Sequence, residues 1–190
     1  LVEPIAVGVH AVNKARPEPG MRVAVIGAGT IGLVAAAAAS RHGVDVDIVA
    51  RHEPQFTAAE RLGLRPVQGQ ELGSGYDLVI DAAGTESSLT GAIGAIRPAG
   101  TIVVPGIYWD DIIVPGLALC LKETQLKVAL YYGYDDGERE TDVAARLLAE
   151  LPELPGALIS NRFELDQARA AFDTAADRAA GAIKVVIDVV

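Results

Sequence analysis

The chain has 190 residues, of which 51% are apolar and 22% are charged, so about one domain with a packed core is expected. Its net charge of −9 argues against a nucleic-acid-binding protein. Its apolar runs are all shorter than the ~18 residues of a membrane-spanning helix. The single cysteine, Cys120, excludes a disulfide framework or a multi-cysteine zinc site within this chain. The chain opens without a signal-peptide pattern, and we expect a cytoplasmic protein.

Strand-like and helix-like segments alternate along the chain, which is typical of a parallel α/β sheet. No linker or internal repeat interrupts them, so a doubly wound, three-layer α/β domain is predicted. Strands are expected at 22–26, 44–50, 77–81, 101–105, 110–114, within the β-prone stretch 126–132, and at 185–190 as a buried closing strand. Helices are expected at 30–42, 54–62, 86–96, 138–151 and 165–177.

A Gly-x-Gly-x-x-Gly loop directly follows the expected strand at 22–26 and opens the expected helix at 30–42. In this context the first glycine allows a tight turn, the second lets a pyrophosphate approach the backbone, and the third permits close packing of helix on strand. The free N–H groups of the first helical turn would point at the phosphates. The loop predicts a dinucleotide site, with packing alone as the structural alternative. Its residues are Gly27, Ala28, Gly29, Thr30, Ile31 and Gly32.

The tip of the second expected strand decides which dinucleotide fits. An acidic residue about 20 positions into the motif normally binds the adenosine ribose, and counting from Gly27 leads to Asp47, which would favour NAD. Asp47 lies inside the strand, however, and the tip is formed by Ala50, Arg51 and His52. A charge-assisted hydrogen bond from Arg51 to a 2′-phosphate contributes roughly 1.5–3 kcal/mol. The sequence therefore favours NADP over NAD, and a solvated loop arginine is the alternative.

Several motifs together resemble the zinc-type medium-chain dehydrogenase/reductases of the alcohol and polyol dehydrogenase kind. In chain order they are residues 1–11 (LVEPIAVGVHA), the glycine loop, 79–84 (VIDAAG), 97–104 (RPAGTIVV) and 181–186 (GAIKVV). The resemblance covers essentially the whole chain. It implies a Rossmann-type NAD(P)-binding domain over 20–190. Residues 1–19 would then be a lead-in segment from an N-terminal catalytic domain of GroES-like fold that this sequence does not include.

The resemblance also implies which further residues face the cofactor. They are Ala83 and Gly84 beside the adenosine half, Pro105, Gly106 and Ile107 by the nicotinamide ribose, and Ala129 and Tyr131, whose backbone would hold the nicotinamide carboxamide. Lys184 would reach the pyrophosphate. The alternative for Lys184 is a snorkelling lysine at the start of a buried strand.

Glu3, which precedes a proline, would by the same resemblance lie at or near a catalytic zinc, as a ligand or as the partner of a metal-bound water. A catalytic zinc needs three protein ligands and an open position. His10, His42 and His52 are scattered, and Cys120 has no partner at ligand spacing. We therefore expect the other ligands to come from the N-terminal domain, and no complete zinc site or catalytic residue within this chain. A solvated N-terminal acid is the alternative for Glu3.

For the intact protein, the resemblance implies hydride transfer between a nicotinamide cofactor and an alcohol or ketone, and a homodimer paired through the edge strand expected at 110–114. This chain alone is expected to bind the dinucleotide. Two alternatives stay open. One is the cofactor domain of a zinc-independent quinone or enoyl reductase, against which Glu3 argues. The other is a nucleotide-binding module without catalysis.

Three further residue groups are expected to be structural. Cys120 is expected in the core, and Asp81 is expected to end a strand without performing chemistry. Asp135, Asp136, Glu138 and Glu140 are expected to form a solvated acidic start to the helix at 138–151, favourable to its dipole.

Overall fold

A six-stranded parallel sheet forms the centre of the computed structural model, which describes residues 1–177, 179 and 181–189. The strand order is β3-β2-β1-β4-β5-β6, the order of doubly wound dinucleotide-binding domains, with the switch point between β1 and β4. The predicted α/β class is therefore confirmed. The strands are β1 (Arg22–Ile26), β2 (Asp45–Val49), β3 (Arg65–Val67), β4 (Tyr76–Asp81), β5 (Ile96–Val104) and β6 (Gln125–Val128).

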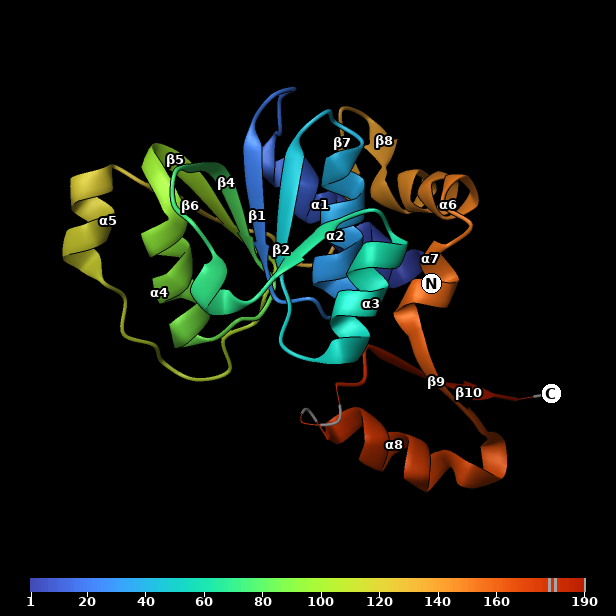
Figure 1. Cartoon of the computed structure of the whole chain (residues 1–190). Coiled ribbons are helices and arrows are strands. Elements are labelled where there is room, and N and C mark those ends of the chain that lie inside the picture. Colours follow the sequence, from blue (N-terminus) through green and yellow to red (C-terminus); the bar gives the residue numbers. More distant parts are fainter. Residues whose placement is uncertain (178, 180, 190) are drawn as a thin grey trace.

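Helices cover both faces of this sheet (Figure 1). One face packs against α1 (Val2–Ala15), α2 (Thr30–Ser40), α3 (Glu53–Arg61), α6 (Glu140–Glu150) and α7 (Leu154–Leu158). The other face packs against α4 (Glu86–Ala95) and α5 (Gly116–Lys122). Two apolar clusters, one on each side of the sheet, form the core. No helix among the described residues is long and apolar enough to cross a membrane.

Helix α1 occupies most of the predicted lead-in segment and packs against the helical layer. Its apolar residues Ile5, Val9 and Val12 recur at helical spacing and are buried. At Gly8 the helix lies so close to α2 that an added Cβ would be 2.6 Å from a methyl carbon of Val34. Alanines Ala35 to Ala39 of α2 are also buried, because small side chains let neighbouring elements approach closely. Residues 2–15 therefore contribute to the core of the nucleotide-binding fold.

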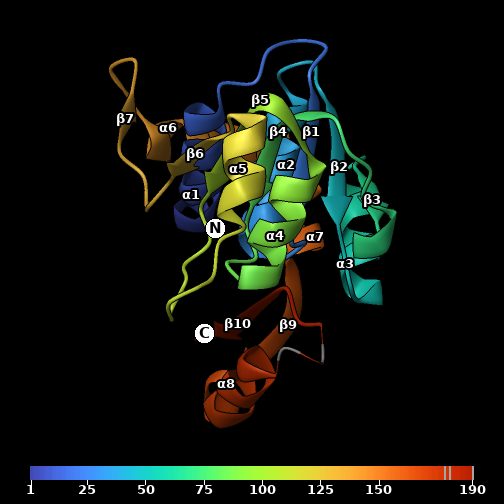
Figure 2. The same ribbon diagram turned by 90° about the vertical axis from the view of Figure 1, so that its left-hand side faces the viewer.

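A smaller unit lies beyond the carboxyl ends of the central strands, in the lower part of Figures 1 and 2. It consists of β9 (Ile159–Glu164), the turn η2 (Leu165–Gln167), α8 (Ala168–Ala176) and β10 (Lys184–Asp188). Among the described strands, β10 pairs with β9 alone, in parallel, and it is half-buried. The predicted closing strand at 185–190 therefore exists as β10, but the prediction that it is buried is wrong, because β10 lies outside the central sheet. Val190 lies outside the described residues.

Two other expectations are wrong. Residues 110–114 form no strand, because β5 already pairs with β4 and β6 and Pro115 follows without an N–H to donate. Cys120 is exposed on α5. The remaining elements are η1 (Gly69–Glu71) and a short hairpin of β7 (Tyr134–Asp135) and β8 (Glu138–Arg139).

Candidate dinucleotide-binding site

The glycine loop joins β1 to α2 at the carboxyl edge of the sheet. Gly27 has a φ of 103°, a left-handed conformation that favours glycine, and its N–H donates to the carbonyl of Val49 over 3.3 Å. A Cβ added to Gly32 would lie 1.7 Å from the carbonyl oxygen of Gly27. Gly27 therefore adopts the conformation that the turn requires, and Gly32 lies too close to the backbone of Gly27 for any side chain.

Gly29 has a different environment, since a Cβ added to it meets nothing within 4 Å. It is the N-cap of α2, and no side chain in the described part of the chain caps this helix. The first N–H groups of α2 therefore lack a side-chain partner and carry the positive end of the helix dipole. Uncapped N–H groups beside open space at a switch point fit the pyrophosphate of a dinucleotide.

Asp47 is unavailable to a ribose. It lies inside β2, is 3% exposed and forms an ion pair with Arg65. The hydroxyl of Tyr76 donates to its Oδ2 atom over 2.5 Å. Burial, followed by the hydrogen bond to Asp47, raises the pKa of Tyr76 to about 12. The prediction that Asp47 lies within the strand is confirmed, and its carboxylate serves the fold.

The segment after β2 presents Arg51 at the surface. Ala50 is buried and donates to Val67, while the N–H of Arg51 donates to Oε1 of Gln55 over 2.9 Å. The guanidinium of Arg51 forms no ion pair with the described residues. His52 is the N-cap residue of α3. The backbone is thus fixed locally while the Arg51 side chain extends from an exposed position.

The segment that carries Lys184 returns to the glycine loop. The hydroxyl of Thr30 donates to the carbonyl of Ile183 over 2.7 Å. Gly181, with a φ of 71°, approaches the β2 tip so closely that an added Cβ would be 2.8 Å from the Cβ of His52. The structure therefore brings three separate predicted regions together: the first turn of α2, the tip of β2 and the start of β10.

A buried carboxylate connects the loops that follow β4 and β5. Asp81 is fully buried, and its Oδ1 atom accepts from the N–H groups of Ala83 and Gly84 over 3.1 and 3.3 Å. Its Oδ2 atom accepts from the hydroxyls of Ser88 and Tyr108, each over 2.9 Å. Burial and the charge of Asp81 raise the pKa of Tyr108. Asp81 therefore performs a structural role, as expected.

The same two loops touch directly. A Cβ on Gly84, whose φ is 62°, would be 2.8 Å from the carbonyl oxygen of Ile107, and one on Gly106 would be 2.6 Å from the nitrogen of Gly84. Pro105 begins this second loop at the end of β5. The predicted adenosine-side and nicotinamide-side positions are thus neighbours in space. Ser88 and Tyr108 were not predicted to contact Asp81, although the spacing of Thr85 and Ser88 at the start of α4 is a recognisable capping box.

Ala129 and Tyr131 follow β6. Ala129 is buried, and its N–H donates to the carbonyl of Val104 over 3.0 Å. Tyr131 is 67% exposed and has a φ of 59°, which is uncommon for a residue with a Cβ. The structure therefore places Ala129 beside the end of β5.

The residues present do not make a zinc site. Among the described residues, no three His, Cys, Asp or Glu side chains are grouped closely enough to hold a metal ion. Glu3 is exposed in the first turn of α1, and His10 is hydrogen-bonded to Glu140.

The strand order and the open glycine loop define a nucleotide-binding α/β domain. The glucose dehydrogenase C-terminus family matches residues 1–189. The chain belongs to this family and is a C-terminal domain of the medium-chain dehydrogenase/reductase kind.

Individual relatives agree with this membership. D-xylulose reductase A of Aspergillus oryzae (strain ATCC 42149 / RIB 40) is 33% identical over 177 residues, which cover 84% of this chain and 49% of that protein. The chain spans about half the length of the curated relatives it matches.

Solved structures share the fold. L-idonate 5-dehydrogenase from Escherichia coli str. K-12 substr. MG1655 has a TM-score of 0.83 at 22% identity, over 99% of this chain and 56% of that chain. A putative zinc-binding dehydrogenase from Sinorhizobium meliloti 1021, bound to NADP, has a TM-score of 0.78 at 23% identity. The match covers 98% of this chain and 57% of that chain.

Proposed function

We propose that this chain is the NAD(P)-binding part of an oxidoreductase that transfers hydride between a nicotinamide cofactor and an alcohol or ketone of the polyol class. The observation that carries the proposal is the uncapped start of α2 beside the open space at Gly29. The family membership and the names of the relatives, which include D-xylulose reductase A, support the reaction class and the substrate class.

Within this proposal, the chain's residues bind and orient the dinucleotide. The N–H groups at the start of α2 hold the pyrophosphate, and Lys184, on the segment that Thr30 anchors, adds positive charge. Ala83, Gly84 and the 105–107 loop lie along the cofactor, with their mutual position set by Asp81. The backbone of Ala129 and Tyr131 holds the carboxamide. The cofactor itself supplies the hydride chemistry when bound.

In this proposal, the zinc ligands lie in residues outside this chain. Glu3 is the residue of this chain that would lie at or near the metal. A cofactor domain of a zinc-independent quinone or enoyl reductase is the second candidate. The Glu3-Pro4 pair at the start of α1 favours the zinc-dependent candidate, by the family resemblance.

The first test concerns the choice of dinucleotide. We expect the 190-residue chain to bind NADPH more tightly than NADH in calorimetry, because Arg51 is exposed and free of ion pairs among the described residues and can pair with a 2′-phosphate. Arg51→Ala is expected to weaken NADPH binding by about tenfold and to leave the affinity for NADH unchanged. Arg41→Ala, which removes an exposed arginine paired with Glu150, is the control. Equal affinities of the unaltered chain for the two dinucleotides would contradict the NADP preference.

We also propose a homodimer through the exposed apolar region of α5 and β6. The outer edge of β6 pairs with no other described strand, and unpaired edges favour association. Large exposed apolar side chains lie on β6, on α5 and in the loop before α5; they are Leu126 and Val128, Leu117 and Leu121, and Trp109 and Ile113. Although 110–114 is not itself a strand, it adds to this region.

Light scattering on the purified chain checks the dimer. We expect twice the mass of the 19.7 kDa chain, and a monomer after Leu121→Glu, because a charge would be buried in the contact. Leu165→Glu changes an equally apolar exposed residue outside this region and should leave the dimer intact. A monomeric unaltered chain would rule the proposal out.

A further inference from the structure

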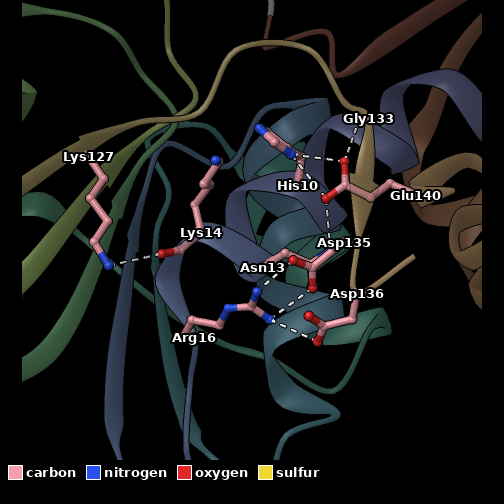
Figure 3. Close-up of polar contacts among 9 residues, drawn as sticks. All are labelled: His10, Asn13, Lys14, Arg16, Lys127, Gly133, Asp135, Asp136 and Glu140. Atoms are coloured by element: carbon pink, nitrogen blue, oxygen red, sulfur yellow. Dashed lines mark hydrogen bonds and ion pairs between the residues drawn. The ribbon is translucent and has the colours of Figure 1, made fainter. Parts of the chain in front are cut away.

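Glu140, the first residue of α6, is a buried acid that is hydrogen-bonded by two other segments, α1 and the loop at Gly133 (Figure 3). It is 1% exposed. Its carboxylate lies 2.9 and 3.0 Å from Nδ1 of His10, and the amide of Asn13 donates to it over 2.9 Å. The N–H of Gly133 donates over 2.6 Å. The expectation of a solvated acid is wrong here, because two side chains of α1, some 130 residues away in the chain, cover it.

These contacts keep Glu140 charged. Burial by itself would raise the pKa of Glu140, but the hydrogen bonds from Gly133, Asn13 and His10 outweigh it and lower the pKa below the ordinary value. A charged acceptor strengthens each of these hydrogen bonds. By contrast, Glu138 two residues earlier is exposed and pairs with Arg146 at the surface. Glu140 is therefore a fixed anchor within the helical layer.

The anchor fixes one end of the predicted nicotinamide loop, 129–133. Gly133 and Glu140 bond reciprocally, since the N–H of Glu140 also donates to the carbonyl of Gly133 over 3.0 Å. At the other end, Ala129 is bonded to Val104 of β5. Residues 130–132 have no backbone hydrogen bond to other described residues. The loop is therefore a short span held at its two ends.

Tyr131 lies in the middle of that span with a φ of 59°. A left-handed conformation is unfavourable for a residue with a Cβ and persists where its surroundings impose it. The tyrosine ring is mostly exposed, so packing of the side chain does not impose it. The restraint on the backbone comes from the two ends of the loop, and Glu140 provides one of them.

We propose that Glu140 is a positioning residue for the nicotinamide half of the cofactor. Held by His10 and Asn13, it fixes Gly133, and through Gly133 it keeps the backbone of Tyr131 in the conformation that receives the carboxamide. The proposal rests on the proposed function, because it assumes that a dinucleotide binds with its nicotinamide at 129–131. It assigns to α1 a part in cofactor orientation besides its packing in the core.

Calorimetry with two ligands tests the proposal on the 190-residue chain. NADPH contains the nicotinamide, whereas 2′-phospho-ADP-ribose retains only the adenosine, phosphate and ribose groups. Glu140→Ala is expected to weaken NADPH binding by about tenfold and to change 2′-phospho-ADP-ribose binding by less than about twofold. Glu140→Gln should recover part of the loss, because its amide oxygen can still accept from Gly133. Glu150→Ala, at the exposed far end of α6, should change neither affinity.

The outcomes separate this proposal from the proposed function. If the unaltered chain binds neither NADPH nor NADH, the proposed function fails and this proposal fails with it. If the unaltered chain binds NADPH, and Glu140→Ala weakens the binding of NADPH and of 2′-phospho-ADP-ribose equally or weakens neither, only the positioning role is overturned. If Glu140→Ala does not fold, Asn13→Ala replaces it. This variant is expected to weaken NADPH binding by about threefold and to leave 2′-phospho-ADP-ribose binding unchanged. Equal effects of Asn13→Ala on both ligands would overturn the role as well.

Discussion

Gly29→Ala is expected to abolish most dinucleotide binding while leaving the free energy of unfolding almost unchanged. Gly29 has a φ of −81° and a ψ of −174°, which alanine adopts without strain. An added Cβ meets nothing within 4 Å, so the folded chain accommodates it, and alanine also lowers the entropy of the unfolded chain. The methyl group would, however, occupy space where a pyrophosphate approaches the backbone. We expect a loss of at least tenfold in affinity, or about 1.4 kcal/mol.

Gly32→Ala provides the matched comparison, because the same substitution three residues later has a different physical consequence. Its Cβ would lie 1.7 Å from the carbonyl oxygen of Gly27 and 2.9 Å from the carbonyl carbon, and backbone atoms cannot move aside as a flexible side chain can. We expect the free energy of unfolding to fall by about 3 kcal/mol, and binding to be lost with it. Urea unfolding and calorimetry on both variants measure the two effects.

The contrast between the two variants is the test. A Gly29→Ala chain that unfolds as easily as Gly32→Ala would show that the glycine serves the turn and not a ligand. A Gly29→Ala chain of unchanged stability and unchanged dinucleotide affinity would exclude a pyrophosphate at this loop.

Local patterns were sufficient to predict the glycine loop. The strand expected at 22–26 matches β1, and the helix expected from Thr30 matches the start of α2. The strand, turn and helix signals follow one another directly in the sequence, so each element is specified by its own residues. The position of Asp47 inside β2 was equally readable. What the sequence did not show is that Arg65 and Tyr76 occupy its carboxylate, since β3 and β4 reach it only after the sheet has formed.

The predictions that were wrong concern features that depend on residues far away in the sequence. Residues 110–114 have the composition of a strand but do not pair with β5, because β6 already occupies that side of β5. Glu140 looked like a surface acid in its local sequence, yet the packing of α1 against α6 covers it with His10 and Asn13. Local sequence also gave no reason to expect that β10 would pair with β9 outside the central sheet. Burial of polar groups therefore required the tertiary contacts.

Asp81→Ala is expected to be among the most destabilising single substitutions in the chain. It removes a fully buried carboxylate and leaves four donors without their acceptor: two N–H groups at 83–84 and the hydroxyls of Ser88 and Tyr108. Each unsatisfied buried group costs about 1–3 kcal/mol. Since the hydroxyls can find other partners by rotating, we expect a net loss of about 3–4 kcal/mol in the free energy of unfolding, measured by urea unfolding.

Two milder variants show whether the acceptor, and not merely the space it fills, is responsible. Asp81→Asn keeps the size and one carbonyl oxygen for the N–H groups of Ala83 and Gly84, and its amide can donate to the hydroxyls, so a loss of only about 1 kcal/mol is expected. Tyr108→Phe removes one donor and should cost about 1–1.5 kcal/mol. Equal losses for Asp81→Ala and Asp81→Asn would contradict the hydrogen-bonding role. Because Asp81 sets the loops at 83–84 and 106–107 against each other, Asp81→Ala should also weaken dinucleotide binding more than Tyr108→Phe does.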